Sequence, residues 1–444
     1  MHLGGEAMLF AVLATICTAI VFGLFPALRT AHTNPAVAMK GQAAQALGGQ
    51  GKTRLRGTLV TAQIAFSMVL LVLAGLFVQS LRNVARIDLG LDVDSLVSFQ
   101  VFPRFNGYDA ARTGALYDRI ERALAAQPGV RGVASAAVPV IAGSASHLSV
   151  KVEGFDNGGE PISASYNMVS PSFFGTLGIP LRKGREFTAA DTAGAPRVAL
   201  VNERFAQEYG LDGKARGKHL SFGPNSLEII GVVADTAYSR IKGEVPAQFF
   251  LPLGRADADN PFAILTAPFF YVRTAIDPDV LLKAIPRVIA SIDPTLPVAN
   301  LITMRRQVSE DVFVDRLVTI LSASFAALAV LLAAIGLYGV LAYNVAARTR
   351  ELGLRLALGA EPEDLRLMVL KQVGGMALIG LGVGLIAGIG AGRAAEALLY
   401  GLSGHDPVVL VGAAVVLAAV VLAASYWPAR RASSIAPMEA LRHE

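Results

Sequence analysis

The chain has 444 residues, of which 53% are hydrophobic and only 16% charged, and its net charge is +5. Because soluble globular chains carry about 25% charged residues, this composition excludes a disordered or fibrous protein and disfavours an entirely soluble enzyme. The apolar residues concentrate in five stretches without Asp, Glu, Lys or Arg, each long enough to cross a bilayer as a helix. The five stretches are Ala7–Leu28, Gly57–Leu81, Leu317–Ala347, Gln372–Gly392 and Pro407–Ala429.

The first stretch contains Cys17, the only cysteine, so neither a disulfide within one chain nor a thiolate metal site is expected. The stretch runs into Pro26–Lys40, which aligns without gaps with Pro428–Arg442, including two prolines at the same spacing. This internal repeat indicates that the first stretch is the last span of a preceding half. Because Met1–Gly5 also lacks the basic start of a signal peptide, we expect a further segment before residue 1.

Two short segments outside the stretches, residues 29–56 and 348–371, carry five basic residues each, and the first has no acidic residue. Short loops rich in Lys and Arg stay in the cytoplasm. The predicted orientation therefore places the N-terminus outside, 29–56 inside, 82–316 outside, 348–371 inside, 393–406 outside and the C-terminus inside.

The sequence GGQGKT at Gly48–Thr53 contains part of a phosphate-binding motif. The full motif requires a glycine where this chain has Ala46, and a buried strand before it. We interpret the segment as a flexible basic linker that attracts lipid headgroups, not as a nucleotide site.

Residues 82–316 contain 25 basic and 25 acidic residues, which is typical of a folded extracytoplasmic domain. Since the basic residues do not cluster, nucleic acid is not an expected partner. Two strand–helix–strand units are predicted at the ends of the segment, a pattern typical of a split β-α-β pair. They are Leu96–Val101, Ala110–Ala126 and Val130–Val138, then Phe269–Arg273, Pro278–Ser291 and Leu296–Leu301. Between them we predict an apolar segment at Val198–Val201, a short helix at Glu203–Tyr209, a strand at Leu227–Val233 and an apolar edge at Gln248–Leu253.

The sequence contains no recognisable spacing of catalytic or metal-binding residues. His147 and His219 have no neighbours at metal-ligand spacing and are interpreted as surface or hydrogen-bonded residues, and no G-x-S-x-G motif occurs. A membrane-anchored enzyme is therefore disfavoured. A secondary transporter is disfavoured too, because no stretch contains an ionisable Asp, Glu, Lys or Arg for an ion pathway.

The third stretch is longer than a bilayer core requires, and the charged segment Met304–Arg316 before it is compatible with a helix. We therefore predict one long helix that leaves the outer domain as a stalk and enters the membrane. Glycines in the third and fourth stretches predict close helix packing. They are Gly336, Gly339, Gly374, Gly375, Gly380, Gly382, Gly384, Gly388 and Gly390.

The most informative segment is RTRELGLRLALGAEPEDLRLMVLK, residues 348–371. Glu351 and Arg355 form an i,i+4 pair, Gly359 can end a short helix, and Pro362 can begin a second helix that continues into the fourth stretch. The pattern predicts a helical elbow parallel to the membrane. It can be an ordinary interfacial helix or a docking element for a cytoplasmic protein.

The segment Arg348–Ala360, preceded by GLYGVLAYNVAA at 336–347, resembles the coupling-helix signature of FtsX-like ABC permeases of the MacB type. In the outer domain, the segments Val169–Asp191, Val198–Gly210 and Leu227–Thr236 resemble the MacB-type periplasmic core domain. The resemblance implies a membrane protein with an α-helical transmembrane bundle of five spans and a mixed α/β extracytoplasmic domain of MacB periplasmic-core type.

The resemblance also implies a division into four parts. Residues 1–56 would be the last span of a preceding half plus a basic cytoplasmic linker, and 57–81 a transmembrane helix. Residues 82–316 would be the periplasmic core domain with its stalk. Residues 317–440 would be the FtsX-like permease domain, with three spans and the coupling helix near 348–360. Because two-half members carry an earlier half with its own outer domain, the chain is expected to be a C-terminal fragment or a naturally shortened form.

In that family the coupling helix lies in a cleft of an ATPase subunit. The implied docking residues are Arg348, Glu351, Gly353, Arg355, Leu358, Gly359 and Ala360. The implied protein is a non-catalytic permease subunit of the bacterial inner membrane that binds no cofactor itself, because the partner ATPase binds ATP. The stalk would transmit motion to the periplasmic domain for export or extraction of a periplasmic substrate. The alternative is a regulator that activates a periplasmic cell-wall hydrolase. Other implied partners are a second permease half or a second copy, a periplasmic adaptor or substrate protein, and membrane lipids.

Overall fold

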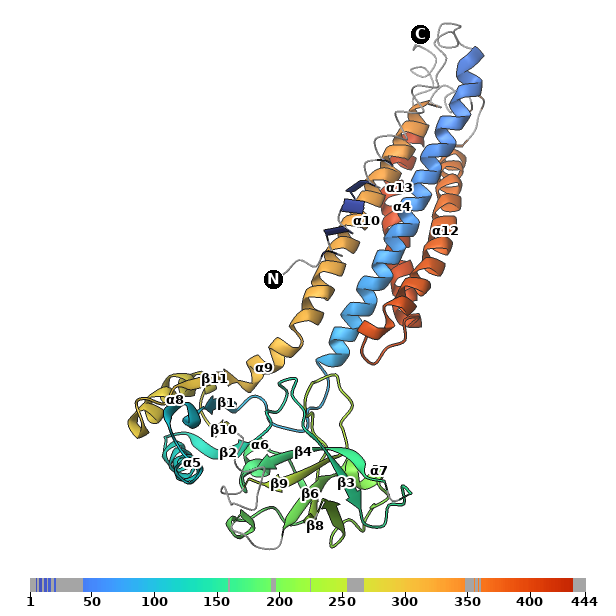
Figure 1. The fold of residues 1–444 in the computed structure, drawn as a ribbon. Helices are drawn as coiled ribbons and strands as arrows, with labels where there is room; N and C mark the ends of the chain where they lie inside the picture. Colours follow the sequence, from blue (N-terminus) through green and yellow to red (C-terminus); the bar gives the residue numbers. More distant parts are fainter. Residues whose placement is uncertain are drawn as a thin grey trace. The chain divides into compact units, whose positions relative to one another are not determined.

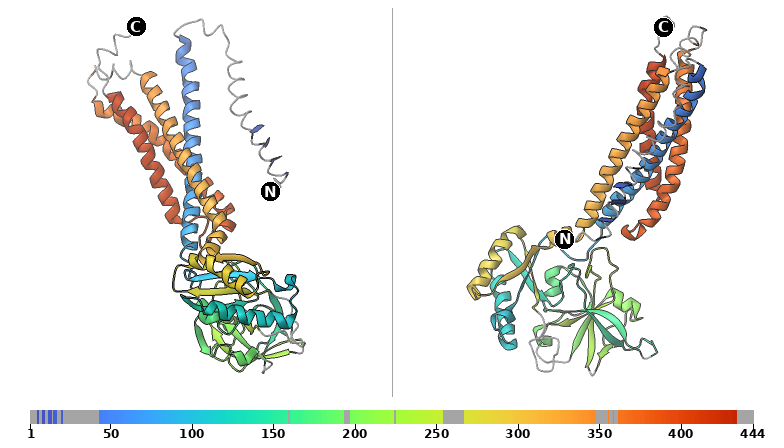
Figure 2. Two further views of the ribbon diagram at one scale, coloured as in Figure 1. Left: turned by 90° about the vertical axis from the view of Figure 1, so that its left-hand side faces the viewer. Right: turned by 45° about the horizontal axis from the view of Figure 1, so that its top comes forward.

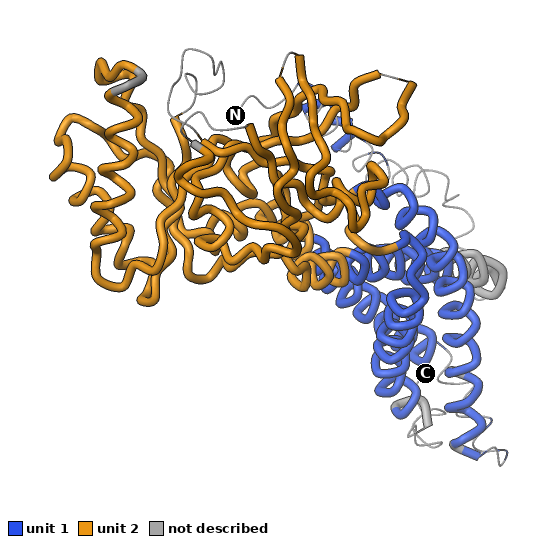
Figure 3. The backbone as a smooth tube through the Cα atoms, turned by 90° about the horizontal axis from the view of Figure 1, so that it is seen from below, with its two compact units in different colours: residues 1–76, 322–397, 403–444 blue, residues 77–321, 398–402 orange. Residues whose placement is uncertain are grey.

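The computed structural model describes most of the chain after residue 42. The described residues are 5, 8–9, 12–13, 15–16, 20, 43–158, 160–192, 197–223, 225–253, 267–347, 355, 358 and 361–433. They form two compact units (Figure 3). Unit 1 comprises residues 1–76, 322–397 and 403–444, and unit 2 comprises residues 77–321 and 398–402. Every described strand lies in unit 2.

Four helices among the described residues are long and apolar enough to cross a membrane (Figure 1). They are α4 (Ala43–Val84), α10 (Phe313–Ala347), α12 (Pro362–Ala394) and α13 (Pro407–Ser433). These helices contain four of the five predicted stretches. Of the fifth, Ala7–Leu28, only residues 8–9, 12–13, 15–16 and 20 are described. Of the internal repeat, Pro26–Lys40 lies outside the described residues, and Pro428–Arg442 is described only as far as Ser433.

The prediction of a flexible linker at Gly48–Thr53 is wrong, because α4 begins at Ala43 and includes this segment. No proline interrupts the sequence from Ala43 to Val84, and most of its residues are good helix formers. The glycines near its start are therefore tolerated inside a helix that continues into the apolar stretch.

The glycines of the fourth stretch were predicted to allow close helix packing, and three of them lie where α12 packs closely against α4. A Cβ atom at Gly384 would lie only 2.6 Å from the Cβ of Met68, and one at Gly380 would lie 2.9 Å from the Cβ of Ile64. These two positions and Gly388, which faces Val72, recur at every fourth residue on one side of α12. Small residues at this spacing let two helix backbones approach within a membrane. By contrast, a Cβ would meet no described atom within 4 Å at Gly374, Gly375, Gly382, Gly390 and Gly339.

One part of the sheet in unit 2 consists of four antiparallel strands in the order β11-β1-β10-β2. Its strands are β1 (Leu96–Val101), β2 (Val130–Ala136), β10 (Phe269–Thr274) and β11 (Val298–Thr303). The helices α5 (Ala110–Ala125) and α8 (Pro278–Ile292) pack beside one another on this sheet, as Figure 2 shows. Leu116, Ile120 and Leu124, at the predicted spacing of four, are buried between α5 and the sheet. The predicted split β-α-β pair is confirmed.

Through pairing of β2 with β4, the sheet continues into a closed barrel of six strands. The strands are β3 (His147–Val152), β4 (Ile162–Val169), β6 (Val198–Asn202), β7 (His219–Phe222), β8 (Asn225–Val233) and β9 (Gln248–Pro252). They pair in the order β4-β3-β7-β8-β6-β9, and parallel pairing of β9 with β4 closes the ring. Phe205 and Tyr209, in and just after α7 (Glu203–Glu208), pack into its core against Phe249. The strand β8 and the helix α7 were predicted, and β6 and β9 lie at the predicted apolar segments, whereas β3, β4 and β7 were not predicted.

The predicted stalk helix is not continuous. A short helix, α9 (Met304–Asp311), is followed by a single turn residue, Val312, before α10 begins. Val312 has a ψ angle of 5°, away from the helical value, and it packs together with Val308 against the main core of unit 2. The prediction of one helix is therefore wrong at this residue, because tertiary contacts outweigh the local preference of the sequence.

Candidate functional site

Most of the predicted coupling helix lies outside the described residues, namely Arg348, Glu351, Gly353, Gly359 and Ala360. Two of its members are described. Leu358 is 79% exposed, and an Nη1 atom of Arg355 lies 3.4 Å from the Sδ atom of Met368 on α12. The docking role of these seven residues stays a prediction.

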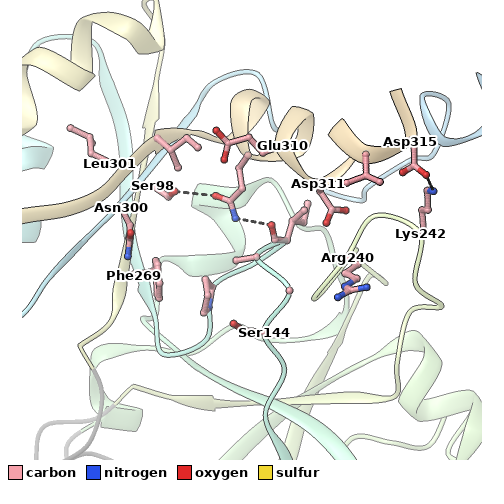
Figure 4. Close-up of a pocket in the computed structure, with 17 residues that line it drawn as sticks. Ser98, Ser144, Arg240, Lys242, Phe269, Asn300, Leu301, Glu310, Asp311 and Asp315 are labelled. Carbon is pink, nitrogen blue, oxygen red and sulfur yellow. Dashed lines mark hydrogen bonds and ion pairs between the residues drawn. The ribbon is translucent and has the colours of Figure 1, made fainter. Parts of the chain in front are cut away.

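A different group of residues comes together in unit 2, where α9 and the first turns of α10 meet two loops. We call residues 304–321 with the loops 138–144 and 238–242 the stalk junction. An open cleft of about 1070 Å³ lies here (Figure 4). Its lining includes Ser98, Ile141, Gln307, Asp311, Asp315 and Lys242.

The two loops of the stalk junction are bound to each other and to the core by backbone hydrogen bonds. The N–H of Ile141 donates to the carbonyl of Tyr238 at 2.7 Å, and that of Gly143 donates to Ser239 at 2.8 Å. The N–H of Val140 donates to the hydroxyl of Tyr271 at 2.9 Å. Burial raises the pKa of Tyr271, so its hydroxyl remains neutral. The loop 138–144 is therefore bound by the backbone of residues 238–239 and by the Tyr271 hydroxyl, and these groups do not titrate near neutral pH.

Gln307 of α9 is bound by the same loop. Its Nε2 atom donates to the carbonyls of Val140 and Ile141, at 2.8 Å each, and its Oε1 atom lies 3.4 Å from the hydroxyl of Ser98 on β1. Ile141 is 1% exposed and has a φ angle of 55°, which is strained for a β-branched side chain. Such strain persists only where the surroundings enforce it, and it is frequent at switch regions.

Two carboxylates follow Gln307 at intervals of four residues, one on each side of the break at Val312. The Oδ2 atom of Asp311, on α9, accepts a hydrogen bond of 3.1 Å from the N–H of Ile241. Asp315, on α10, forms an ion pair with Lys242, and Figure 4 shows the two side chains meeting at one end of the cleft. The loop 238–242 therefore contacts the helices on both sides of Val312.

The other entry of the chain into unit 2, at the end of α4, is held differently. Val84 is 4% exposed, and Leu89, Leu91 and Val93 in the following loop pack against the same core. The loop also bonds through its backbone: the N–H of Ala237 donates to Leu89 at 3.0 Å, and that of Asp92 donates to Leu177 at 2.9 Å.

One ion pair reinforces this second entry. An Oδ2 atom of Asp92 lies 2.6 Å from an Nη2 atom of Arg273. Burial acts to raise the pKa of Asp92, but the hydrogen bonds from Arg273 and Ser95 outweigh it and hold this pKa below its ordinary value. The carboxylate is therefore ionised throughout the neutral range.

The two histidines of unit 2 and the possible metal-binding side chains among the described residues were compared with the arrangements that catalysis requires. His147 lies 3.4 Å from the hydroxyl of Ser165, and His219 lies 3.0 Å from a carboxylate oxygen of Glu153, so both are hydrogen-bonded as predicted. Across the described part of the chain, no three His, Cys, Asp or Glu side chains are placed to hold a metal ion. The stalk junction binds α9 and the first turn of α10 through polar side chains.

Sequence reasoning did not find the stalk junction. The available signal was the spacing of Gln307, Asp311 and Asp315, three polar residues at intervals of four before an apolar stretch. Their partners Ile141 and Lys242 belong to loops more than 70 residues earlier in the chain, and only the fold brings them together.

Two family models match the chain. One, described as MacB-like periplasmic core domain, matches residues 58–291, which are more than half of the chain. The other, described as FtsX-like permease C-terminal, matches residues 323–437.

Several curated relatives and solved structures are also similar. The macrolide export ATP-binding/permease protein MacB 1/2 of Paracoccus denitrificans is 26% identical over 380 residues, which are 82% of this chain and 52% of that protein. The uncharacterized ABC transporter permease YknZ of Bacillus subtilis is 23% identical and covers 64% of this chain and 71% of that one. The crystal structure of the periplasmic region of MacB from Actinobacillus actinomycetemcomitans has a TM-score of 0.35 and 14% identity, covering 51% of this chain and 95% of that structure. The chain spans about half the length of the curated MacB relatives that match most of it.

Proposed function

Because the chain belongs to the family of MacB/FtsX-type ABC transporter permeases, we propose that it is a non-catalytic subunit that couples ATP hydrolysis by a separate ATPase to motion of its periplasmic domain. The motion serves export or extraction of a periplasmic substrate, and the protein resides in the bacterial inner membrane. Its partners are the ATPase, a second permease half or a second copy of this chain, a periplasmic adaptor or substrate protein, and the surrounding lipid.

The observation that carries this proposal is the continuity of α10. It is one helix from Phe313 to Ala347, about 52 Å at 1.5 Å per residue, whose first residues belong to unit 2 and whose remainder belongs to unit 1. A helix is stiff along its axis over such a length. A displacement applied at its cytoplasmic end would therefore reach the stalk junction, where polar side chains hold its other end.

The route for the input is the segment that follows Ala347 directly. The resemblance of 348–360 to the coupling helix of the family supports docking of the ATPase there, through Arg348, Glu351, Gly353, Arg355, Leu358, Gly359 and Ala360. Motion of the docked ATPase would then act on α10 and α12, the two helices that flank this segment in the chain.

The test is a charge reversal in the proposed docking segment of the full chain. We expect Glu351→Lys to abolish co-purification of the ATPase and its stimulation by the permease in vesicles, since reversing a charge in the docking segment disrupts charge complementarity with the partner. Glu363→Lys, which reverses an exposed charge in the first turn of α12, is the matched control and should retain both. Unchanged binding and stimulation in Glu351→Lys would contradict the proposal.

The regulator alternative uses the same transmitted motion with a different output, activation of a periplasmic cell-wall hydrolase. Nothing among the described residues favours it over export. A vesicle assay with the ATPase, ATP and a cell-wall hydrolase separates the two, because only the regulator raises hydrolase activity when ATP is added.

A further inference from the structure

The cleft at the stalk junction has walls that are fixed by the fold. Two of them, the loops 138–144 and 238–242, are joined by the backbone hydrogen bonds of Ile141 and Gly143. The lining also includes Asn300, and Ile141 and Asn300 are the two non-glycine residues with a positive φ angle in the described part of the chain, at 55° and 52°. Strained backbone of this kind gathers at ligand clamps and switch regions. The cleft is therefore shaped before any ligand enters it, which reduces the ordering cost of binding.

Three of the five charged side chains that line the cleft already have partners of opposite charge. Asp315 is paired with Lys242, and both line the cleft. Glu310 is paired with Arg306, with 3.3 Å between the charged atoms. Because opposite charges in a pair largely cancel at a distance, these side chains contribute little net charge to the cleft. The charge that a ligand meets comes mainly from the two lining side chains that remain.

The two remaining charges, Arg240 and Asp311, are opposite in sign. Among the residues that the structure describes, the Arg240 side chain forms no ion pair or hydrogen bond, and Asp311 forms no ion pair. The Oδ2 atom of Asp311 accepts the N–H of Ile241, the residue after Arg240, so the two charges extend from adjacent positions. Figure 4 shows both in the part of the cleft near the pair of Lys242 and Asp315. One cation and one anion without partners favour a ligand that carries both charges.

An exposed apolar face of α10 begins at the same part of the cleft. Val314 lines the cleft and is 65% exposed, and Leu317 and Leu321 follow on α10 with 42% and 55% exposure. Residues spaced by three and seven share one face of a helix. Because α10 is only slightly longer than a bilayer with its headgroup layers, about 52 Å against about 40–45 Å, its first turns reach the outer headgroup layer. The unpaired charges thus lie beside an apolar face at the depth of lipid headgroups.

We propose that the cleft holds the headgroup of one phosphatidylethanolamine molecule, with its phosphate at Arg240, its ammonium at Asp311 and its acyl chains along Val314, Leu317 and Leu321. A guanidinium donates to phosphate oxygens in a planar fork, and an ammonium donates to a carboxylate. A glycerol headgroup has no cation for Asp311, and a choline headgroup has a cation without an N–H to donate. The site rests on the proposed membrane location of the chain but not on the proposed docking of an ATPase.

The test is native mass spectrometry of the full chain in detergent, titrated separately with phosphatidylethanolamine, phosphatidylglycerol and phosphatidylcholine that have identical acyl chains. We expect one phosphatidylethanolamine per chain, bound about tenfold more tightly than either other lipid, because only its ammonium donates to Asp311. Free phosphoethanolamine carries the same headgroup without acyl chains, and it should not displace the lipid at a hundredfold excess. Displacement at an equal concentration would overturn a lipid site in favour of a soluble ligand.

Two substitutions test the two ends of the headgroup. Arg240→Gln removes the guanidinium and should weaken phosphatidylethanolamine binding about tenfold. Asp311→Asn keeps an acceptor for the N–H of Ile241, but it should reduce the preference for phosphatidylethanolamine over phosphatidylglycerol to less than about threefold. Arg316→Gln is the matched control, because Arg316 is an exposed arginine near the start of α10 that does not line the cleft. It should leave both affinities unchanged.

Three results overturn the proposed site, provided that the unfolding midpoint in the same detergent shows each variant to be folded. The first is unchanged phosphatidylethanolamine binding in Arg240→Gln. The second is an equal loss in Arg316→Gln, which would indicate a general attraction of lipid to basic residues. The third is a lipid-free dimer that Val314→Asp converts to a monomer, which would assign the apolar face to a second copy of the chain. Co-purification of the ATPase with Glu351→Lys is measured separately, so failure of the lipid site is distinguishable from failure of the proposed coupling.

Discussion

Unit 2 holds the chain by two unlike anchors, one at the end of α4 and one at the stalk junction. The first uses buried apolar side chains such as Val84 and Leu89, together with backbone hydrogen bonds. The second uses the side chains of Gln307, Asp311 and Asp315 around a break in a helix. Apolar burial is lost only when a whole segment moves away, whereas a polar side-chain contact can break singly. The α4 anchor therefore depends on burial of a whole segment, whereas the stalk junction depends on individual polar contacts.

The largest expected effect comes from breaking the α4 anchor at Gly90. This residue has a φ angle of +68°, and a Cβ there would lie 2.4 Å from the carbonyl oxygen of Asp235. We expect Gly90→Val to lower the free energy of unfolding by about 3 kcal/mol or more, from backbone strain and steric overlap together. Chemical unfolding of the full chain in detergent measures it.

The control for this prediction is Gly107→Ala. Gly107 also has a positive φ angle, +77°, but a Cβ there would meet no described atom within 4 Å. Its substitution should cost only about 1 kcal/mol, the strain alone. Equal losses in the two variants would show that the loop around Gly90 is not a tight anchor.

The next largest effect is expected at the stalk junction. Gln307→Leu has a similar volume but leaves the carbonyls of Val140 and Ile141 without their side-chain donor, which should cost about 1–3 kcal/mol of unfolding free energy. Gln307→Glu should cost as much at neutral pH, because a carboxylate cannot donate a hydrogen bond. If Gln307→Leu were as stable as the wild type, the binding of α9 by loop 138–144 would contribute nothing.

A smaller effect, with a defined pH dependence, is expected at Asp92. Its pKa is lower in the folded protein than in the unfolded chain, so its contribution is complete above the ordinary carboxyl pKa and is lost as the pH falls through the lowered value. Asp92→Asn should therefore lower stability by about 1 kcal/mol at pH 7, allowing for solvent screening, and by less at pH 3. Unfolding midpoints in urea at pH 7, 5 and 3 check this. A loss that grew toward acid pH would contradict the assigned direction.

The smallest effect is expected from the exposed pair of Arg305 and Asp94, which joins α9 to the loop after α4. Their side chains are 73% and 69% exposed, with 3.0 Å between the charged atoms. Exposed ion pairs contribute little, so Arg305→Ala should change the unfolding free energy by less than about 0.5 kcal/mol. A change above 1 kcal/mol would show that the two anchors are energetically connected through this pair.

The sequence was a good guide where the apolar pattern is regular. Leu116, Ile120 and Leu124 recur at intervals of four and predicted α5, and Leu96–Val101 is a strand at the expected residues. The barrel was not predicted, because β3 and β7 are short strands with exposed polar residues, and β4 is closed onto β9 by pairing between distant segments. The break at Val312 was missed for a related reason: the core of unit 2, against which Val308 and Val312 pack, is built from segments remote in the chain.

The parallel pairing of β4 with β9 has a consequence for the behaviour of unit 2 among other proteins. A sheet that closes on itself has no free strand edges, and free edges are the usual templates for edge-to-edge aggregation. Of the strands that the structure describes, β11 and β5 (Leu181–Gly184) each pair along one side only, and β5 is only four residues long. Edge-to-edge pairing with another copy of unit 2 is therefore confined, among the described strands, to these two edges.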